Sequence, residues 1–415
     1  MSKGRLFALP LVFLVLAACD TGGTTSQSSP SGTPSAQAWP TGGPLAVYDG
    51  PNGSTHTISV VGFVTVGVPS PKARVLASVT VASRTQGPVG PAPACPPSLN
   101  GALGGCGAPA FDLPYISTSK TKIYVLDGDA TVKALAPDGS LTKVTSIPGT
   151  AAARATFAVS PDDSQIAVGV DDFRSGKVSL YVENLHGGGH VDVFGRAPFY
   201  WPIGWHAGKV VLAFGSVVTL SNPYVASGYA LIDPSAGAQP VALGNGDCVP
   251  TGTVNSAGTA CVAKPGSPCL EDPVSNATST YYYSCLRRLS WAGSETNFLL
   301  PSNAYTSTFT VGNAALSPDG QVIMTDQLGR VLAPLSNTHG GNAFLGSSST
   351  SGQANLQMGW ISNEYFSTSV VGPDGATTQS IVALNPPDYN GIRGVTFVGA
   401  APTVGSLVGT LPGGL

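Results

Sequence analysis

A strand–turn–strand unit over residues 157–170 restricts the fold of this chain more than any other feature. It reads Phe157-Ala-Val-Ser-Pro-Asp-Asp-Ser-Gln-Ile-Ala-Val-Gly-Val170, with apolar and β-branched residues on both sides of a Pro-Asp-Asp turn. Proline presets the backbone dihedral at the second position of a turn, and aspartate tolerates the conformations that follow. Two further strand patterns, over 177–185 and 190–194, are separated by the turn His186-Gly-Gly-Gly189. The stretch therefore predicts four short antiparallel strands in succession.

Similar turns, each followed by an apolar strand, recur along the chain. They are centred near Ser119, Asp162, Ala207, Ala257, Pro318 and Asn363. The steps between them are 43, 45, 50, 61 and 45 residues, and the longest step contains a cysteine-rich insertion. A four-stranded propeller blade takes about 40–50 residues. The spacing predicts an all-β protein, a β-propeller of about seven four-stranded blades, with six blades as the alternative.

We expect the first blade to be completed by the C-terminal end of the chain. A hairpin over 58–66 and 73–82 turns at Pro69-Ser-Pro71, and residues 84–110 after it are rich in Gly and Pro with no strand pattern. Strands three and four of that blade are therefore missing. The stretch 403–411 is apolar enough to supply a strand. Mixing the two ends of the chain in one blade hides sheet edges that would otherwise be exposed.

Two of the turns carry a family resemblance. Ser160-Pro-Asp-Asp-Ser-Gln-Ile-Ala-Val and Ala315-Leu-Ser-Pro-Asp-Gly-Gln-Val-Ile-Met324 resemble the Pro-Asp repeats of TolB-like, PD40-type propellers. The other turns depart from that pattern, as Trp205-His-Ala-Gly does. The resemblance implies the propeller fold over residues 45–411. It implies no particular activity, because function does not follow from this fold.

The first 18 residues resemble the signal peptide of a bacterial lipoprotein. Lys3 and Arg5 precede an apolar run over 6–16, which ends in Leu16-Ala-Ala-Cys19. The run is too short for a stable transmembrane span. The resemblance implies cleavage before Cys19 and acyl chains that anchor the protein through this cysteine. The alternative interpretation is an incidental cysteine after a secretory signal.

The segment after Cys19 fits the same layout. Residues 19–44 are rich in Ser, Thr, Gly and Pro and carry almost no charge, which predicts a flexible tether. Residues 45–415 then form the propeller domain. We expect an extracytoplasmic protein that is anchored to the bacterial membrane by lipidated Cys19.

The remaining cysteines are typical of disulfide bonds. They are Cys95, Cys106, Cys248, Cys261, Cys269 and Cys285. An even number in an exported chain predicts three bridges. We expect Cys95 to pair with Cys106 inside the Gly/Pro-rich loop, and the other four to pair among themselves in one of three ways. Neither a C-x-x-C spacing nor a nearby histidine indicates metal binding, and we expect no cofactor.

Charge argues against polyanionic partners. Charged residues are 10% of the chain, against about 25% in an average protein. Without Lys3 and Arg5, 17 basic and 22 acidic residues remain, which gives a net charge of 17 − 22 = −5. A nucleic-acid partner would need a basic surface, which this chain does not have. The chain also has no G-x-S-x-G elbow, so it carries no hydrolase signature of that type.

One group of residues is predicted to form a binding surface, which we call the candidate rim. Its members are Asp171, Asp172, Arg174, Tyr200, Trp201 and Trp205. The first three lie on a loop between the second and third strands, and the aromatic residues lead into the next blade. Such loops open on one face of a propeller, where charged groups among apolar walls suit a ligand or partner. The alternative is structural: Trp205 packs between blades, and Asp171 and Asp172 cap a turn.

These observations predict a non-enzymatic binding or scaffold module for an envelope protein or a cell-wall-associated partner. The rival hypothesis is a propeller-channel enzyme, of the lyase, lactonase or cyclotransferase type, acting on a small extracellular substrate. That chemistry needs histidines and carboxylates on the innermost strands. The candidate innermost stretches 156–160 and 313–317 contain neither. A third interpretation is a bare stability scaffold for another protein, and the oligomeric state is left open.

Overall fold

The computed structural model describes residues 38–64, 71–85, 113–172, 177–195, 200–214, 226, 228–244, 248–263, 286–298, 314–325, 330–332, 343–344, 359–371, 377–387, 393–401 and 405–415. All of them belong to one compact unit, Gln37–Leu415. Every regular element in these residues is a β-strand. The fold is therefore all-β, as the repeat predicts.

The strands form seven four-stranded antiparallel sheets, which we number as blades 1 to 7. Blade 1 contains β28 (Ser406–Leu411), β1 (Leu45–Asn52), β2 (Thr55–Val64) and β3 (Lys72–Ala82). Blade 2 contains β4 (Ile116–Thr118), β5 (Ile123–Asp127), β6 (Thr131–Leu135) and β7 (Leu141–Ser146). Blade 3 contains β8 (Ala153–Val159), β9 (Gln165–Asp172), β10 (Lys177–Asn184) and β11 (Val191–Gly195). Blade 4 contains β12 (Tyr200–His206), β13 (Lys209–Phe214), β14 (Gly228–Ile232) and β15 (Val241–Ala242).

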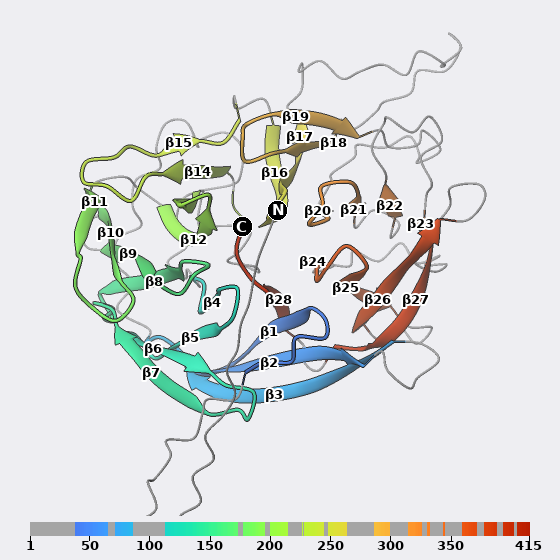
Figure 1. Ribbon diagram of the computed structural model, residues 1–415, viewed down its shortest axis with the longest axis horizontal. Coiled ribbons are helices and arrows are strands. Elements are labelled where there is room, and N and C mark those ends of the chain that lie inside the picture. Colours follow the sequence, from blue (N-terminus) through green and yellow to red (C-terminus); the bar gives the residue numbers. More distant parts are fainter. Residues whose placement is uncertain are drawn as a thin grey trace, which may run out of the picture. The chain divides into compact units, whose positions relative to one another are not determined.

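The last three blades follow the same order. Blade 5 contains β16 (Cys248–Asn255), β17 (Gly258–Ala263), β18 (Leu286–Leu289) and β19 (Glu295–Phe298). Blade 6 contains β20 (Ala314–Leu316), β21 (Ile323–Thr325), β22 (Arg330–Leu332) and β23 (Ala343–Phe344). Blade 7 contains β24 (Gly359–Trp360), β25 (Tyr365–Val371), β26 (Thr377–Pro387) and β27 (Arg393–Ala400). Figure 1 shows the blades around a common centre, with the first strand of each blade innermost. This is the β-propeller architecture.

Blade 1 is built from both ends of the domain. β28 pairs antiparallel with β1, and Leu411 lies opposite Leu45. The predicted C-terminal strand is thus confirmed, but the predicted place of the 58–66 and 73–82 hairpin is wrong. This hairpin forms the third and fourth strands of the blade, and β28 and β1 supply the inner two. Burial explains the error: residues 45–50 are all buried, so β1 shows none of the alternation that marks a strand with one exposed face.

The packed domain starts before its first strand. Trp39 is 7% exposed and belongs to the main apolar cluster with Leu45 and Ile123. This cluster joins blades 1, 2 and 3, and a second cluster around Trp205 and Val210 joins blades 3 and 4. Neighbouring blades therefore hold one another through buried side chains.

The predicted turns between first and second strands are confirmed in blades 2 to 7. In blade 3 the Ser160 hydroxyl donates to Asp162 Oδ1 at 2.6 Å and accepts from the Gln165 amide at 2.9 Å. Blade 6 repeats this pattern, with Ser317 donating to Asp319 at 2.5 Å and accepting from the Val322 amide at 2.9 Å. The Ser-Pro-Asp motif thus acts as a side-chain cap that satisfies backbone amides in the turn.

Candidate functional site

The two aspartates of the candidate rim lie at the end of β9, on opposite faces of the strand. Side chains alternate along a strand, so Asp171 points to the same face of β9 as Gly169. This face packs closely against blade 4, because a Cβ added at Gly169 would lie 2.7 Å from Pro202. Asp171 is buried, whereas Asp172 is partly exposed. Burial raises the pKa of Asp171 to about 7, and the positive charge of Arg154, its register partner on β8, opposes that rise. Asp171 is therefore a poor contact for an external ligand. Arg174 lies outside the described residues.

The aromatic residues of the candidate rim all lie on β12 but do not form one surface. Tyr200 meets Phe194 of blade 3 edge-on, with ring centroids 6.0 Å apart. Trp201 is 4% exposed and packs in a different cluster, with Tyr229 and Val254. β12 thus places Tyr200 and Trp201 in two different apolar clusters. Only Asp172 and Tyr200 of the described rim residues offer a substantial accessible surface.

Trp205 is held by a hydrogen bond between blades. Its indole Nε1 donates to the Ala158 carbonyl of β8 at 3.0 Å. Trp360 of blade 7 makes the equivalent bond to Ala315 of blade 6 at 2.8 Å. Both indoles join the first strand of one blade to the first strand of the preceding blade. This repetition accounts for the position of Trp205 without a ligand.

A buried polar cluster that sequence reasoning missed joins blades 1, 2 and 3. The Arg84 guanidinium donates to the carbonyls of Leu113 at 2.7 Å, Pro114 at 2.9 Å and Ala155 at 3.2 Å. It also lies 4.2 Å above the ring of Tyr115. Arg84 is 7% exposed, so the carbonyl oxygens and the ring replace water around its charge.

A second polar pair extends this cluster within blade 1. His56 stacks on Tyr115 with ring centroids 3.9 Å apart, and its Nδ1 lies 2.8 Å from Asp49 Oδ1. Both members of the pair are buried. A His and an Asp in apolar strands on either side of a tight turn are the sequence signal that would have pointed to this pair. Its stacking partner lies 59 residues beyond His56 in the chain, and no local pattern connects them.

A cavity of about 330 Å³ lies at the centre of the propeller, among the first strands of blades 1, 2, 4, 5 and 7. Its apolar wall residues include Ile116, Ile203, Val254, Trp360 and Leu407. Several polar side chains of the wall are already hydrogen-bonded within the protein. The Ser117 hydroxyl accepts from the Val159 amide at 2.9 Å, and the Asn363 side chain accepts from the Asp319 amide at 2.9 Å. No Asp, Glu, Lys, Arg or His occurs among the described residues of the wall.

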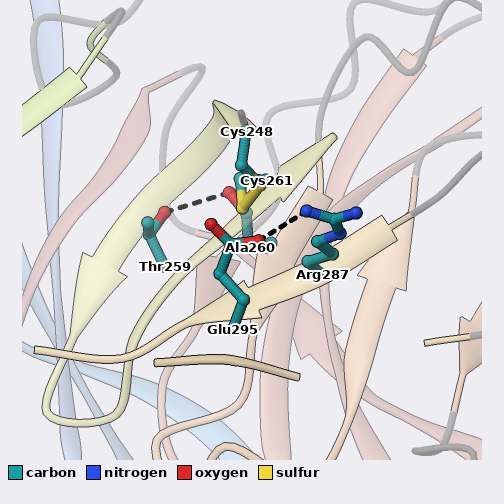
Figure 2. Close-up of a disulfide and its surroundings, with 6 residues drawn as sticks. All are labelled: Cys248, Thr259, Ala260, Cys261, Arg287 and Glu295. Atoms are coloured by element: carbon teal, nitrogen blue, oxygen red, sulfur yellow. Dashed lines mark hydrogen bonds and ion pairs between the residues drawn. A yellow bond between two sulfur atoms is a disulfide. The ribbon is translucent and has the colours of Figure 1, made fainter. Parts of the chain in front are cut away.

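Blade 5 contains the disulfide that the structure describes. Cys248 of β16 is bonded to Cys261 of β17, with the Cα atoms 5.5 Å apart (Figure 2). Beside the bridge, Arg287 Nη1 donates to Glu295 Oε2 at 2.5 Å. This bridge belongs to one of the three predicted pairings. Cys19, Cys95, Cys106, Cys269 and Cys285 lie outside the described residues.

Two properties of the described residues bear on metals and membranes. Within them, no three His, Cys, Asp or Glu side chains lie close enough together to hold a metal ion. The same part of the chain contains no helix long and apolar enough to cross a membrane.

Comparison with known proteins gives a likeness of structure only. No protein-family model matches the chain, and no curated protein matches it. A putative TolB from Agrobacterium tumefaciens is 11% identical, with a TM-score of 0.34, and the match covers 72% of this chain and 84% of that one. The β-propeller domain of the Trilobed protease from Pyrococcus furiosus is 8% identical, with a TM-score of 0.34, over 81% of this chain and 95% of that one.

A third similar structure is prolyl oligopeptidase B from Galerina marginata. It is 12% identical, with a TM-score of 0.38, and the match covers 82% of this chain but 44% of the enzyme. This chain therefore spans less than half of that protein. At such identities and TM-scores, these likenesses assign neither a family nor a function.

Proposed function

We propose that this protein is a non-enzymatic binding or scaffold module, anchored outside the cytoplasm through lipidated Cys19, for an envelope protein or a cell-wall-associated partner. The fold supplies a rigid ring of blades, on which loops and channel mouths are the usual binding surfaces. The Pro-Asp turns, which resemble those of TolB-like propellers, support the same class of protein.

The neutral wall of the central cavity carries this proposal. A channel enzyme needs an acid, a base or a bound metal beside its substrate. On the seven innermost strands, which are all described, only Arg154 and His206 contribute a side chain of the Asp, Glu, Lys, Arg or His type. Arg154 lies near the start of β8 in blade 3, and His206 is the last residue of β12 in blade 4. The cavity thus favours binding of an uncharged group over proton transfer.

Site-specific photocrosslinking in membranes tests the binding role. A benzophenone amino acid at Ser256, beside the cavity, or at Tyr200, on the candidate rim, should crosslink one specific partner. The same group at Lys143, an exposed position on the outer strand β7, is the matched control and should capture none. Equal capture from Lys143, or no partner from any of the three positions, would contradict the proposal.

The anchor has its own test. Cys19→Ser should remove the lipidation site, so that the protein is released from membranes or stays unprocessed. Fractionation of cells that express the two forms gives the answer. A Cys19→Ser protein that matures and sediments with membranes as the native protein does would show that Cys19 is not the anchor.

A further inference from the structure

The segment Pro412–Leu415, which we call the mouth segment, crosses three blades after leaving blade 1. The Gly413 amide donates to the Ser119 carbonyl in the first turn of blade 2 at 2.7 Å. Gly414 lies against Pro161 in the matching turn of blade 3, where an added Cβ would be 3.3 Å from the proline ring. Leu415 reaches the end of β12 in blade 4. Figure 1 shows β28 and the C-terminus near the common centre of the blades.

Main-chain groups hold the end of the mouth segment. The Leu415 amide donates to the Trp205 carbonyl at 3.2 Å, and the His206 Nδ1 donates to the Leu415 main-chain oxygen at 2.9 Å. The ring of His206 is itself stacked on Trp291 of blade 5, at 5.2 Å between centroids. The propeller thus offers the Trp205 carbonyl as an acceptor and the His206 imidazole as a donor. These groups can bind the main chain of any extended segment.

Gly204 makes a slot for the Leu415 side chain. A Cβ added at Gly204 would lie 2.6 Å from Leu415 Cδ1, so only glycine leaves room for the leucine. Gly204 and Leu415 both belong to the wall of the central cavity. An apolar side chain of a bound segment therefore enters a slot whose described wall residues carry no ionisable side chain, and a charge there would lose its hydration. The nearest ionisable side chain that binds the segment, His206, is bonded to the main-chain oxygen of Leu415.

We propose that the mouth of the central channel binds an extended, uncharged peptide segment of a partner, and that the mouth segment occupies this site in the free protein. This inference rests on the proposed binding role and names the chemistry of the partner. The contacts of Pro412–Leu415 define what is recognised: an extended main chain and one apolar side chain at the slot beside Gly204. A partner's segment competes with the mouth segment for the same groups.

Peptide titration of a shortened protein tests the site directly. In a variant that lacks residues 412–415, a blocked Leu-Pro-Gly-Gly-Leu peptide should shift the imidazole NMR signals of His206 toward their position in the full chain. The full chain should show no such shift, because its site is occupied. A Leu-Pro-Gly-Gly-Asp peptide should bind at least about tenfold more weakly, because its carboxylate is desolvated in the slot. A cooperative thermal transition establishes that the shortened protein is folded.

A substitution at the slot gives a second test that needs no deletion. A Cβ at position 204 would lie 2.6 Å from Leu415 Cδ1, so it takes the space that an apolar side chain occupies in the slot. Gly204→Ala should therefore lose partner crosslinking from Ser256. Gly195→Ala is the matched control, because a Cβ added at Gly195 meets no atom within 4 Å, and it should keep that crosslinking. A cooperative thermal transition of both variants establishes that they are folded.

The outcomes separate this inference from the binding role itself. If the neutral peptide fails to move the His206 signals of a folded shortened protein, or if both peptides bind equally, the inference is wrong. If a partner is crosslinked equally in Gly204→Ala and Gly195→Ala, the protein binds partners elsewhere and the mouth is not their site. If the peptide binds but no partner is ever captured in membranes, the proposed function fails while the site stands.

Discussion

Backbone groups, more than opposite charges, hold the buried polar side chains of this propeller. Trp205 and Trp360 donate to carbonyls of the preceding blade, and Arg84 donates to three carbonyls. A chain with 10% charged residues has few ion pairs to distribute, so main-chain oxygens take their place. Each such bond satisfies a group whose burial without a partner would cost about 1–3 kcal/mol.

Asp171 is the residue whose titration we expect to affect stability. Its pKa in the folded protein is raised to about 7 by burial, against about 3.9 in an unfolded chain. The folded state therefore binds more protons than the unfolded state between about pH 4 and 7, and the free energy of unfolding falls as the pH rises through this window. Asp171→Asn should remove that fall, which amounts to about 1–4 kcal/mol.

Urea denaturation of both proteins from pH 4 to 8 measures the effect. Asp172→Asn, the partly exposed neighbour on the same strand, is the matched control and should keep the pH dependence of the native protein. Parallel pH profiles for the native protein and Asp171→Asn would show that Asp171 is ionised throughout the range in the folded state.

At the scale of elements, the Ser-Pro-Asp turn is a self-contained unit. The hydrogen bond from the Ser160 hydroxyl, followed by bonds from Ser164, lowers the pKa of Asp162 to about 2. The aspartate therefore stays ionised over most of the pH range and keeps the turn closed. Because these bonds are local, the turn is readable from sequence, which explains why the turns of blades 3 and 6 were predicted.

We expect the serine caps of these two turns to contribute similar amounts to stability. Ser160→Ala and Ser317→Ala each leave backbone amides of the turn without their side-chain acceptor, so each should lower the free energy of unfolding by about 1 kcal/mol. Thermal unfolding of the two variants measures the loss. Ser179→Ala is the control: this exposed serine on β10 of blade 3 lies outside the turn, and the change should alter stability little. Equal effects of all three changes would argue against the caps.

Elements that depend on distant partners were harder to predict from the sequence. β1 is buried along its inner residues and pairs with β28, some 360 residues later, so no alternation of apolar and polar residues marks it. The tight Asn52-Gly53 turn between β1 and β2 was the local signal that sequence reasoning missed. The candidate rim was drawn from loops that propellers place on one face. Alternation along β12 instead puts Tyr200 and Trp201 in different clusters, and the bulge between Pro202 and Gly204 then brings Trp205 into the cluster of Tyr200. The cavity is lined by the first strands of five blades, and the mouth segment contacts three blades that lie hundreds of residues earlier in the chain, so no local pattern encodes either of them.

The bridge in blade 5 predicts the remaining disulfides. With Cys248 bonded to Cys261, the two cysteines that lie between β17 and β18 in the sequence, Cys269 and Cys285, are left to each other. Peptide mapping by mass spectrometry under non-reducing conditions should find Cys269–Cys285 and Cys95–Cys106 and no free thiol. A bridge between Cys95 and Cys269 or Cys285 would contradict the local pairing. Each unstrained bridge stabilises the domain by about 2–4 kcal/mol.

At the scale of the whole molecule, closing the ring is the step that joins distant parts of the chain. Blade 1 is completed by β28, and its outer strand β3 leads directly into Arg84. The three carbonyls bound by Arg84 belong to the residues before β4 and to β8. One side chain therefore couples the blade that closes the ring to the next two blades, so its loss is expected to weaken the ring and not one sheet alone.

Arg84→Met tests this coupling. Methionine keeps much of the side-chain volume but donates no hydrogen bond, so three carbonyls lose the guanidinium as a donor and the free energy of unfolding should fall by roughly 2–4 kcal/mol. Arg74→Met, an exposed arginine on the same strand, is the control and should change stability by about 0.5 kcal/mol or less. Hydrogen exchange shows which strands are weakened. In Arg84→Met, the amides of β28, β1, β4 and β8 should lose protection together, because these strands belong to the three coupled blades. Loss of protection confined to β3, or equal stability of the two variants, would show that Arg84 acts only within its own blade.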